Sequence, residues 1–545
     1  MEKKYSRSDI LYIFVKILFS TIFSFTLFLD SKLSFVQELR AGVDKIHFNK
    51  ATPKDYCVFI FAWIISFLII TLIEKIMELL KDKVYKKENK EKKKYVYFII
   101  VAVLLIAWLP YVLTYFPGGI FSDTQRSLMQ CLHIRKYDNA NPFAYTMLLK
   151  IFLGIGDIFQ SAQVGIDAFS IFQTISMAFI LAYFPYWMYK KNFSNVFVIL
   201  VTAFFAIFKL IPMYAVSIWK DTIFSLLLFI YVLEIIKIVD SNGKNLKSWK
   251  EIIKFCIITL AVCLFRNNGF YVAFATNLFI ILVYRKEKII KFSISTIITI
   301  ILAYAIIGPL YNVLGINDPT SRIGWNAVKI NQIFYTKVTN GNITPEQDEL
   351  INQMCKEYKL KEAYAPFLMD ATTINPEFND MFIKMKKKEI DKLWLELFKQ
   401  NPKAYVDAYL LNTLGFWDVN RAFPDAYISN FMWPDTESFI DVHQTDLIED
   451  LTGKSIGNII QVKKLYSSAI FLFITLLSMV LTIYKKNYKS LLIYLPSIFT
   501  WGTIVLATPI AFSMRYVYIL VLMTPIDFII PLLDNNGIKN DERKK

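Results

Sequence analysis

The fold is decided by the stretch YFPGGIFSDTQRSLMQCLHIRKYDNANPFAYTMLLK, at residues 115–150. It leaves an apolar segment at residues 95–115 through a Pro-Gly-Gly turn, and it places the carboxylate of Asp123 a few residues beyond that segment. The letters SDTQ predict a helix start, with Ser122 as the N-cap and Gln125 three residues later, as in a capping box. A short helix just outside the bilayer is therefore expected to carry Asp123.

Asp123 has two interpretations. An acid in the first turn of a helix is stabilised by the positive end of the helix dipole and needs no chemical role. A carboxylate held just outside the bilayer can also act as a general base on a molecule that the membrane carries. The local pattern favours neither interpretation over the other.

The composition is that of an integral membrane protein. Of 545 residues, 55% are hydrophobic and 16% aromatic, and the mean hydropathy is +0.42. The 61 Lys and Arg outnumber the 45 Asp and Glu. The longest basic run, at residues 81–95, lies between two apolar segments, where positive charge fixes the orientation of a membrane protein. We therefore interpret it as a cytoplasmic topology signal that also contacts membrane lipids, and we expect no nucleic-acid binding.

Twelve segments are long and apolar enough to cross or nearly cross a bilayer. They cover residues 10–29, 56–77, 95–115, 164–188, 194–211, 222–240, 252–266, 269–284, 291–311, 466–484, 488–507 and 513–533. The clusters of Lys and Arg all fall on one side only if the apolar piece at residues 142–159 lies on the surface or re-enters. This parity predicts a multi-pass protein of the cell membrane, with cytoplasmic N- and C-termini and Asp123 on the outer face.

The predicted fold is an all-α polytopic membrane protein of about 12 transmembrane helices, with juxtamembrane helices in an external loop and a mostly helical extracellular domain. Its parts are two N-terminal spans and a basic linker (1–94), a transmembrane catalytic core with an external loop at 116–163 (95–311), the extracellular domain (312–465), and three C-terminal spans with a basic tail (466–545). In the extracellular domain, Thr344 and Gln347 predict a capping box, and Asn401 is predicted to end an amphipathic helix.

Three breaks between predicted spans face outward, and each carries one cation. They are IPMYAVSIWKDT with Lys220, FRNNG with Arg266, and ATPIAFSMRY with Arg515. A cation near the apolar depth costs free energy unless it is paired. Each one alone can be explained as an interfacial anchor or a snorkelling side chain. Three on the same face as Asp123 indicate a site where an acid and several cations meet, as transfer from a lipid-linked phosphate requires.

The order of these features resembles the C-type glycosyltransferase superfamily, in particular its protein mannosyltransferases and aminoarabinose transferases. In that superfamily an Asp follows the first core span, and a His-Pro-Pro type segment then begins a juxtamembrane helix. Asp123 and the segment NPFAY stand in the same order here, with Asn141 in place of the usual His. The blocks that carry Lys220, Arg266 and Arg515 look more closely like a family of multi-span proteins of Gram-positive bacteria.

The resemblance implies a glycosyltransferase that moves a sugar from a polyprenyl-phosphate donor to a hydroxyl of a cell-envelope glycan, glycolipid or protein. It implies Asp123 as the base of an inverting displacement, and Lys220, Arg266 and Arg515 as the residues that bind the donor phosphate. Asp221 is either a second acid or the partner that neutralises Lys220. Branches of the superfamily differ in their need for a divalent metal such as Mg²⁺ or Mn²⁺, and neither the His nor the Cys residues are spaced as a metal site.

Aromatic residues alternate with acids near the end of the predicted extracellular domain. Aromatic faces beside carboxylates suit sugar binding, so Trp417, Asp418 and Trp433 are candidates for a platform that holds the acceptor glycan. The same composition suits a domain seated on membrane lipids. No internal repeat, P-loop or dinucleotide-binding turn is found, so nucleotide hydrolysis is not indicated. An alternative function is that of a flippase, transporter or export component, which would use the same cations without a base.

Overall fold

The computed structural model describes residues 6–38, 40–86, 92–316, 326–356, 358, 360, 364–369, 376–422, 438–462, 466–507 and 510–533. The regular structure of these residues is helical, apart from two pairs of two-residue strands. The chain is an all-α membrane protein, as its composition predicts.

Each of the twelve predicted spans contains a helix. Within the described part of the chain, eight helical stretches are long and apolar enough to cross a membrane. They contain α1 (Arg7–Ser31), α2 (Pro53–Leu80), α3 (Tyr95–Thr114), α6 (Ala162–Lys190), α9 (Lys220–Asp240), α12 (Ile290–Ala305), α24 (Leu495–Ala507) and α25 (Tyr518–Ile529). The other four predicted spans correspond to shorter helices, α7 (Asn195–Ile207), α10 (Trp249–Phe265), α11 (Gly269–Tyr284) and α23 (Ser468–Tyr484).

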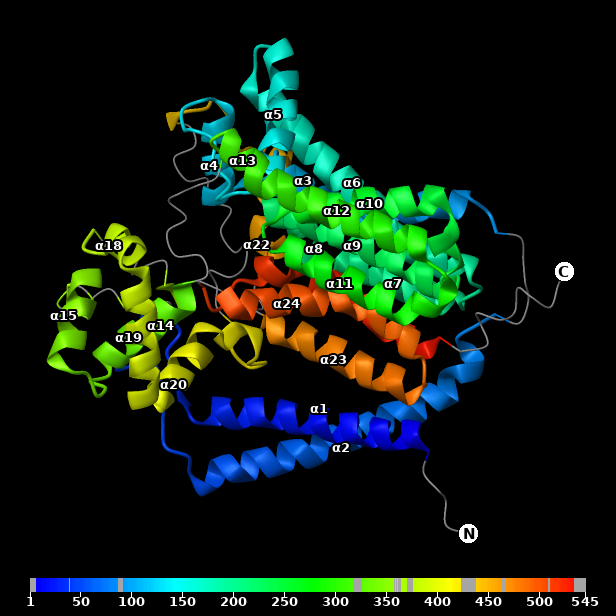
Figure 1. Cartoon of the computed structure of the whole chain (residues 1–545). Helices are drawn as coiled ribbons and strands as arrows, with labels where there is room; N and C mark the ends of the chain where they lie inside the picture. The colour runs from blue at the N-terminus through cyan, green and yellow to red at the C-terminus, as the bar shows by residue number, and fades with distance from the viewer. Residues whose placement is uncertain are drawn as a thin grey trace, which may run out of the picture.

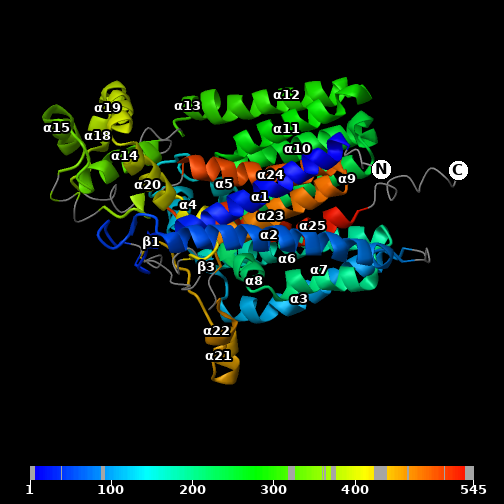
Figure 2. The ribbon, with the colours of Figure 1, turned by 90° about the horizontal axis from the view of Figure 1, so that it is seen from below.

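The long helices run side by side and form a bundle with two distinct ends (Figure 1). Both described ends of the chain, the start of α1 and the segment after α25, lie at one end, which we call the terminal end (Figures 1 and 2). Helices α4 (Ser122–Cys131) and α5 (Phe143–Ile158) lie at the opposite end, which we call the domain end. Asp123 is therefore at the end of the bundle opposite the two termini.

The domain end carries a small helical domain (Figure 1). Its helices are α14 (Ala327–Val338), α15 (Pro345–Met354), α18 (Asp380–Met385), α19 (Lys387–Gln400) and α20 (Pro402–Asn412). The capping box of Thr344 and Gln347 is confirmed, and α19 ends before Asn401 as predicted. Helix α14 packs against α19 and α20, and the buried side chains of these helices belong to the same hydrophobic cluster as those of the bundle.

Helices α1 and α2 form a hairpin that packs on α23. Within the hairpin, the Lys16 ammonium lies 2.7 Å from the Glu74 carboxylate. At the domain end, the Asp30 carboxylate of α1 accepts hydrogen bonds from Arg421 Nε at 2.6 Å and from Asn420 Nδ2 at 2.7 Å. These contacts join the hairpin to the loop that follows the helical domain.

Candidate functional site

Two short strands position the site. β3 (Gly119–Ile120) pairs in parallel with β4 (Ser217–Ile218), with Gly119 opposite Ser217 and Ile120 opposite Ile218. β3 leads into α4 and β4 leads into α9 almost at once. The first turns of these two helices are therefore held side by side at the domain end.

The two strand-to-helix junctions repeat one sequence pattern, Ile-aromatic-x-Asp-Thr, at residues 120–124 and 218–222. The prediction that the chain has no internal repeat is wrong for this five-residue unit. Because the strands are in register, the aromatic residues that follow them stack, with 3.9 Å between the ring centroids of Phe121 and Trp219. Each copy then places its Asp in the first turn of a helix, where the helix dipole favours a negative charge.

Gly118 and Gln173 support this strand pair. Gly118 has a φ of 137°, and a Cβ there would lie 2.3 Å from the carbonyl oxygen of Val216. Gln173, on α6, donates from Nε2 to the carbonyl oxygens of Ala215 and Ser217, both at 2.8 Å. Gln173 could not be found from the sequence, because its only signal is one amide within an apolar segment.

The predicted capping box at the start of α4 is wrong. Ser122 is the first helical residue, and the N-cap is Phe121, which has no side-chain acceptor. The strand pairing extends to Ile120, and Phe121 keeps an extended backbone with φ −114° and ψ 166°. The helix therefore begins one residue earlier than the SDTQ pattern predicts.

Five residues proposed from the sequence, the acids Asp123 and Asp221 and three cations, meet in one cluster of charges. Asp123 Oδ2 lies 2.6 Å from Arg515 Nη1 and 3.1 Å from Lys220 Nζ. Arg266 donates a hydrogen bond to Asp221 Oδ1, and Arg515 Nη1 lies 3.9 Å from Asp221 Oδ2. Arg515 therefore lies between Asp123 and Asp221, which occupy the same position in the two copies of the Ile-aromatic-x-Asp-Thr pattern. We call these five residues the ion cluster.

The ion cluster is largely shielded from solvent. Asp221 is fully buried, and the Lys220, Arg266 and Arg515 side chains are 11–17% exposed. Asp123 is the most accessible member, with 28% of its side chain exposed. Burial alone would raise the pKa of the Asp123 carboxyl, but the charges of Lys220 and Arg515 outweigh this effect and hold its pKa well below the usual range. Asp123 is therefore ionised at neutral pH.

Aromatic rings hold the two guanidinium groups in place. The Arg515 guanidinium lies 5.1 Å from the ring centroid of Trp219 and 4.9 Å from that of Tyr516. The Arg266 guanidinium lies 5.0 Å from the Tyr516 ring and 5.6 Å from that of Phe224. Cations and rings thus alternate, and each contact stabilises a cation in a partly desolvated site.

Asn141 connects the loop before α5 to the ion cluster. Its Nδ2 donates to the backbone carbonyl of Asp123 and to Ser127 Oγ, and its Oδ1 accepts from Lys220 Nζ. One amide therefore orients both the first turn of α4 and the Lys220 ammonium. In the sequence, Asn141 stands only in place of the usual His, and no role could be predicted for it.

The other candidates lie elsewhere. Trp417 is half-buried and donates from Nε1 to the Leu410 carbonyl at 2.9 Å. Asp418 is 1% exposed and lies beside Asp30, in the joint between the hairpin and the helical domain. Trp433 lies outside the described residues. No described contact brings Trp417 or Asp418 to the ion cluster, and their role as a glycan platform stays a prediction.

The described residues contain no group of three or more His, Cys, Asp or Glu side chains that could hold a metal ion. The two carboxylates of the ion cluster contact cations instead. All five cysteines are free thiols.

Comparison with known proteins identifies a family for this chain, but the family has no described activity. The family model described as "Family of unknown function (DUF6020)" matches residues 132–544. The matched part contains Lys220, Asp221, Arg266 and Arg515, and it begins after Asp123. No curated protein and no solved structure matches the chain.

Proposed function

The chain belongs to the DUF6020 family of unknown function, and we propose that it is a membrane glycosyltransferase. It moves a sugar from a polyprenyl-phosphate donor to a hydroxyl of a cell-envelope glycan, glycolipid or protein. The observation that carries this proposal is the contact of Asp123 with Lys220 and Arg515, with Arg266 bound to the neighbouring Asp221. In this proposal the chain crosses the cell membrane twelve times, with cytoplasmic termini and the ion cluster on the outer face.

The charges of the ion cluster suit one lipid-linked phosphate. Its three cations and two carboxylates leave one positive charge, and a sugar–phosphate–lipid diester carries one negative charge. Arg515 and Arg266 can each present two N–H groups to phosphate oxygens, while Lys220 acts as a compact point charge. A phosphate at the exposed side of the cluster would meet all three.

In the reaction we propose, the acceptor hydroxyl gives its proton to the Asp123 carboxylate and its oxygen bonds to the anomeric carbon of the sugar. The bond from that carbon to the phosphate oxygen breaks, and the electron pair leaves with the polyprenyl phosphate. Because attack and departure take place on opposite faces, the configuration at the anomeric carbon inverts. The phosphate gains one negative charge, which the three cations stabilise.

The ion pairs of Asp123 link donor binding to base strength. A carboxylate held by two cations is a weak base, because a base works best when its pKa lies near the operating pH. A donor phosphate that attracts Arg515 and Lys220 weakens those two contacts and raises the proton affinity of Asp123. The base then becomes effective only when the donor is bound.

The same ion pairs favour one second candidate, a carrier for lipid-linked glycans. A carrier would use Lys220, Arg266 and Arg515 to bind the phosphate, and Asp123 would serve only to balance their charge. The two candidates differ in the effect of Asp123→Asn. A transferase loses turnover and keeps donor binding, whereas a carrier keeps its transport rate.

The experiment uses the full chain in vesicles, with a panel of polyprenyl-phosphate sugars labelled in the sugar. Transfer is measured as label in an extract of cell-envelope glycans and proteins, and donor binding by retention of label on the vesicles. We expect Asp123→Asn to lower transfer at least 100-fold, as typical losses for a general base suggest, while donor binding is kept or becomes tighter because Lys220 and Arg515 lose a competing partner. Asp157→Asn, which changes an exposed acid near the end of α5, is the matched control. Equal transfer by the wild type and Asp123→Asn refutes the transferase.

Sidedness is tested separately. In a chain with the exposed Cys57 replaced by Ser, a cysteine placed at the exposed residue Asp157 should react with a membrane-impermeant maleimide added to intact cells, and one placed at Lys81 should react only after lysis. The opposite result would place the ion cluster in the cytoplasm and remove the outer-leaflet donor from the proposal.

A further inference from the structure

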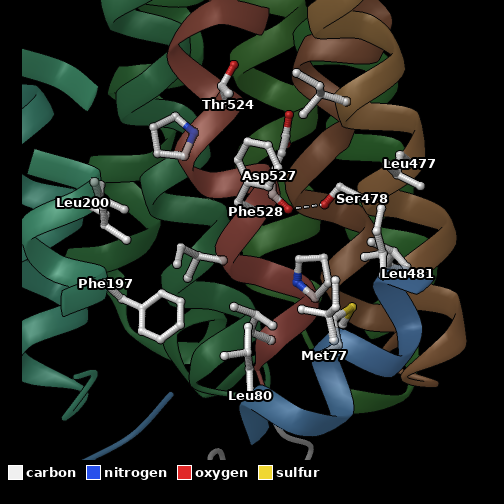
Figure 3. Close-up of a pocket in the computed structure, with 18 of the residues that line it drawn as sticks. Met77, Leu80, Phe197, Leu200, Leu477, Ser478, Leu481, Thr524, Asp527 and Phe528 are labelled. Atoms are coloured by element: carbon white, nitrogen blue, oxygen red, sulfur yellow. Dashed lines mark hydrogen bonds between the residues drawn. The ribbon is translucent and has the colours of Figure 1, made fainter. Parts of the chain in front are cut away.

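A cavity of about 400 Å³ lies within the bundle, toward the terminal end (Figure 3). Its walls come from α2, α7, α23 and the last span, with η11 (Ile530–Leu532) at its edge. Phe197 and Leu200 of α7 face Leu477 and Leu481 of α23 across this space. The volume is in the range of about 300–1,000 Å³ that is usual for small-molecule sites.

The cavity opens toward the lipid-facing surface. Three of its lining residues, Ile76, Leu200 and Phe528, are 42%, 59% and 61% exposed. Ile76 and Phe528 belong to helices long enough to span a bilayer, and Leu200 belongs to a shorter apolar helix beside them; exposed apolar residues on such helices contact hydrocarbon in a bilayer. An occupant therefore enters from the membrane, and its main part is a hydrocarbon chain.

Asp527 adds a carboxyl group to the otherwise mainly apolar lining of this cavity. Its side chain is 1% exposed, and Oδ2 accepts a hydrogen bond from the Thr475 hydroxyl at 2.6 Å. Oδ1 is buried and has no hydrogen-bond partner among the described residues. A buried polar atom without a partner is costly, so this oxygen points to a bound group that the protein itself does not supply.

The chemistry of that group follows from charge. The described lining residues include no Lys, Arg or His. An isolated carboxylate is too costly in apolar surroundings, so the carboxyl is held as the neutral acid, whose O–H needs an acceptor. An anionic headgroup would find no cation in this lining. The segment after Leu533 is also unsuited to the cavity, because seven of its twelve residues are charged.

We propose that this cavity binds a long-chain neutral lipid whose uncharged hydroxyl oxygen accepts a hydrogen bond from Asp527. The chain of the lipid fills the space between α7 and α23. Asp527 follows Arg515 by twelve residues on the last span, which corresponds to about 18 Å along a helix. The site is therefore separate from the ion cluster, and sugar transfer does not depend on it.

The test uses dicyclohexylcarbodiimide, an apolar reagent that modifies protonated carboxyls in membranes. The full chain is washed with detergent, placed in vesicles and treated with the reagent, and modification of the Asp527 peptide is measured by mass spectrometry. We expect Asp527 to be modified, and hexadecanol to lower the modification at least fivefold. Hexadecane and hexadecylamine at the same mole fraction should each change it less than twofold.

Two variants locate the protection at the cavity. Ile76→Trp fills its opening and should lower modification of Asp527 severalfold, whereas Phe14→Trp, at a 61% exposed position of α1 outside the lining, should not. An unmodified Asp527 in alcohol-free vesicles overturns the proposal. Three other results would also overturn the proposal. Equal protection by hexadecane would show that the hydroxyl has no role, and stronger protection by hexadecylamine would show that the ligand is cationic. No protection by any of the three compounds would show that no chain binds in the cavity.

Discussion

Asp418 should make the stability of this protein depend on pH. Its carboxyl is 1% exposed, and Oδ1 accepts a hydrogen bond from the Asn420 backbone N–H at 2.8 Å. Burial, followed by the negative charge of nearby Asp30, raises the pKa of Asp418 from 3.8 to about 8. Folded Asp418 therefore keeps its proton in a range where the unfolded chain has lost it.

The sign follows from proton binding. Between the unfolded pKa of 3.8 and the folded pKa of about 8, the folded state binds one proton more than the unfolded state. The free energy of unfolding therefore falls as pH rises through this window, by about 1.4 kcal/mol per pH unit. From pH 6 to pH 8 the loss is about 2 to 3 kcal/mol, a large part of the stability of a typical protein.

The assay is unfolding in SDS, followed by circular dichroism at pH 6 and pH 8. The Asp418→Asn amide cannot ionise, so we expect the difference between the two pH values to disappear in this variant. Asp30→Asn removes the neighbouring charge and should reduce the difference. Asp450→Asn, at an exposed position on α21 (Leu447–Thr452), should keep the wild-type difference. An identical pH dependence in the wild type and Asp418→Asn refutes the reasoning.

Three further predictions concern the site and its surroundings. Gly118→Ala should lower the free energy of unfolding by about 2 kcal/mol or more, because its Cβ would lie 2.3 Å from the Val216 carbonyl oxygen. Gly154→Ala, which has open space around it, should not lower the free energy of unfolding, and thermal unfolding in detergent compares the two variants. Arg515→Lys should weaken donor binding at least tenfold in the vesicle assay, because a single ammonium cannot replace a planar guanidinium between two acids, and unchanged binding would remove Arg515 from the phosphate site. Burial raises the pKa of the Cys131 thiol to about 12, so the reactive thiolate is scarce at pH 8 and iodoacetamide should modify Cys131 only after unfolding. Label on Cys131 of the folded chain, measured by mass spectrometry, would contradict this prediction.

Much of the helical fold could be predicted from apolar runs, because a segment that spans hydrocarbon must satisfy its backbone internally. The predicted span at 269–284 coincides with α11, and the one at 222–240 lies within α9. The five members of the ion cluster could also be proposed, since a cation at a break between apolar spans needs a partner.

The arrangement inside the site could not be predicted. Strands of two residues have no periodicity, so the pairing of β3 with β4 leaves no signal except the repeated Ile-aromatic-x-Asp-Thr. Which cation contacts which acid depends on the packing of α9, α10 and the last span. The position of Asp527 in a cavity is likewise a property of four packed helices, and a single Asp in an apolar segment does not reveal it.

The contact between Arg515 and Asp123 joins residues 392 positions apart, and Arg515 stands at the beginning of the last span. During synthesis, Asp123 and Lys220 therefore leave the ribosome long before Arg515 does. A nascent chain therefore lacks the complete ion cluster until its final helix enters the bilayer, and a product truncated before that point leaves Asp123 without its Arg515 partner.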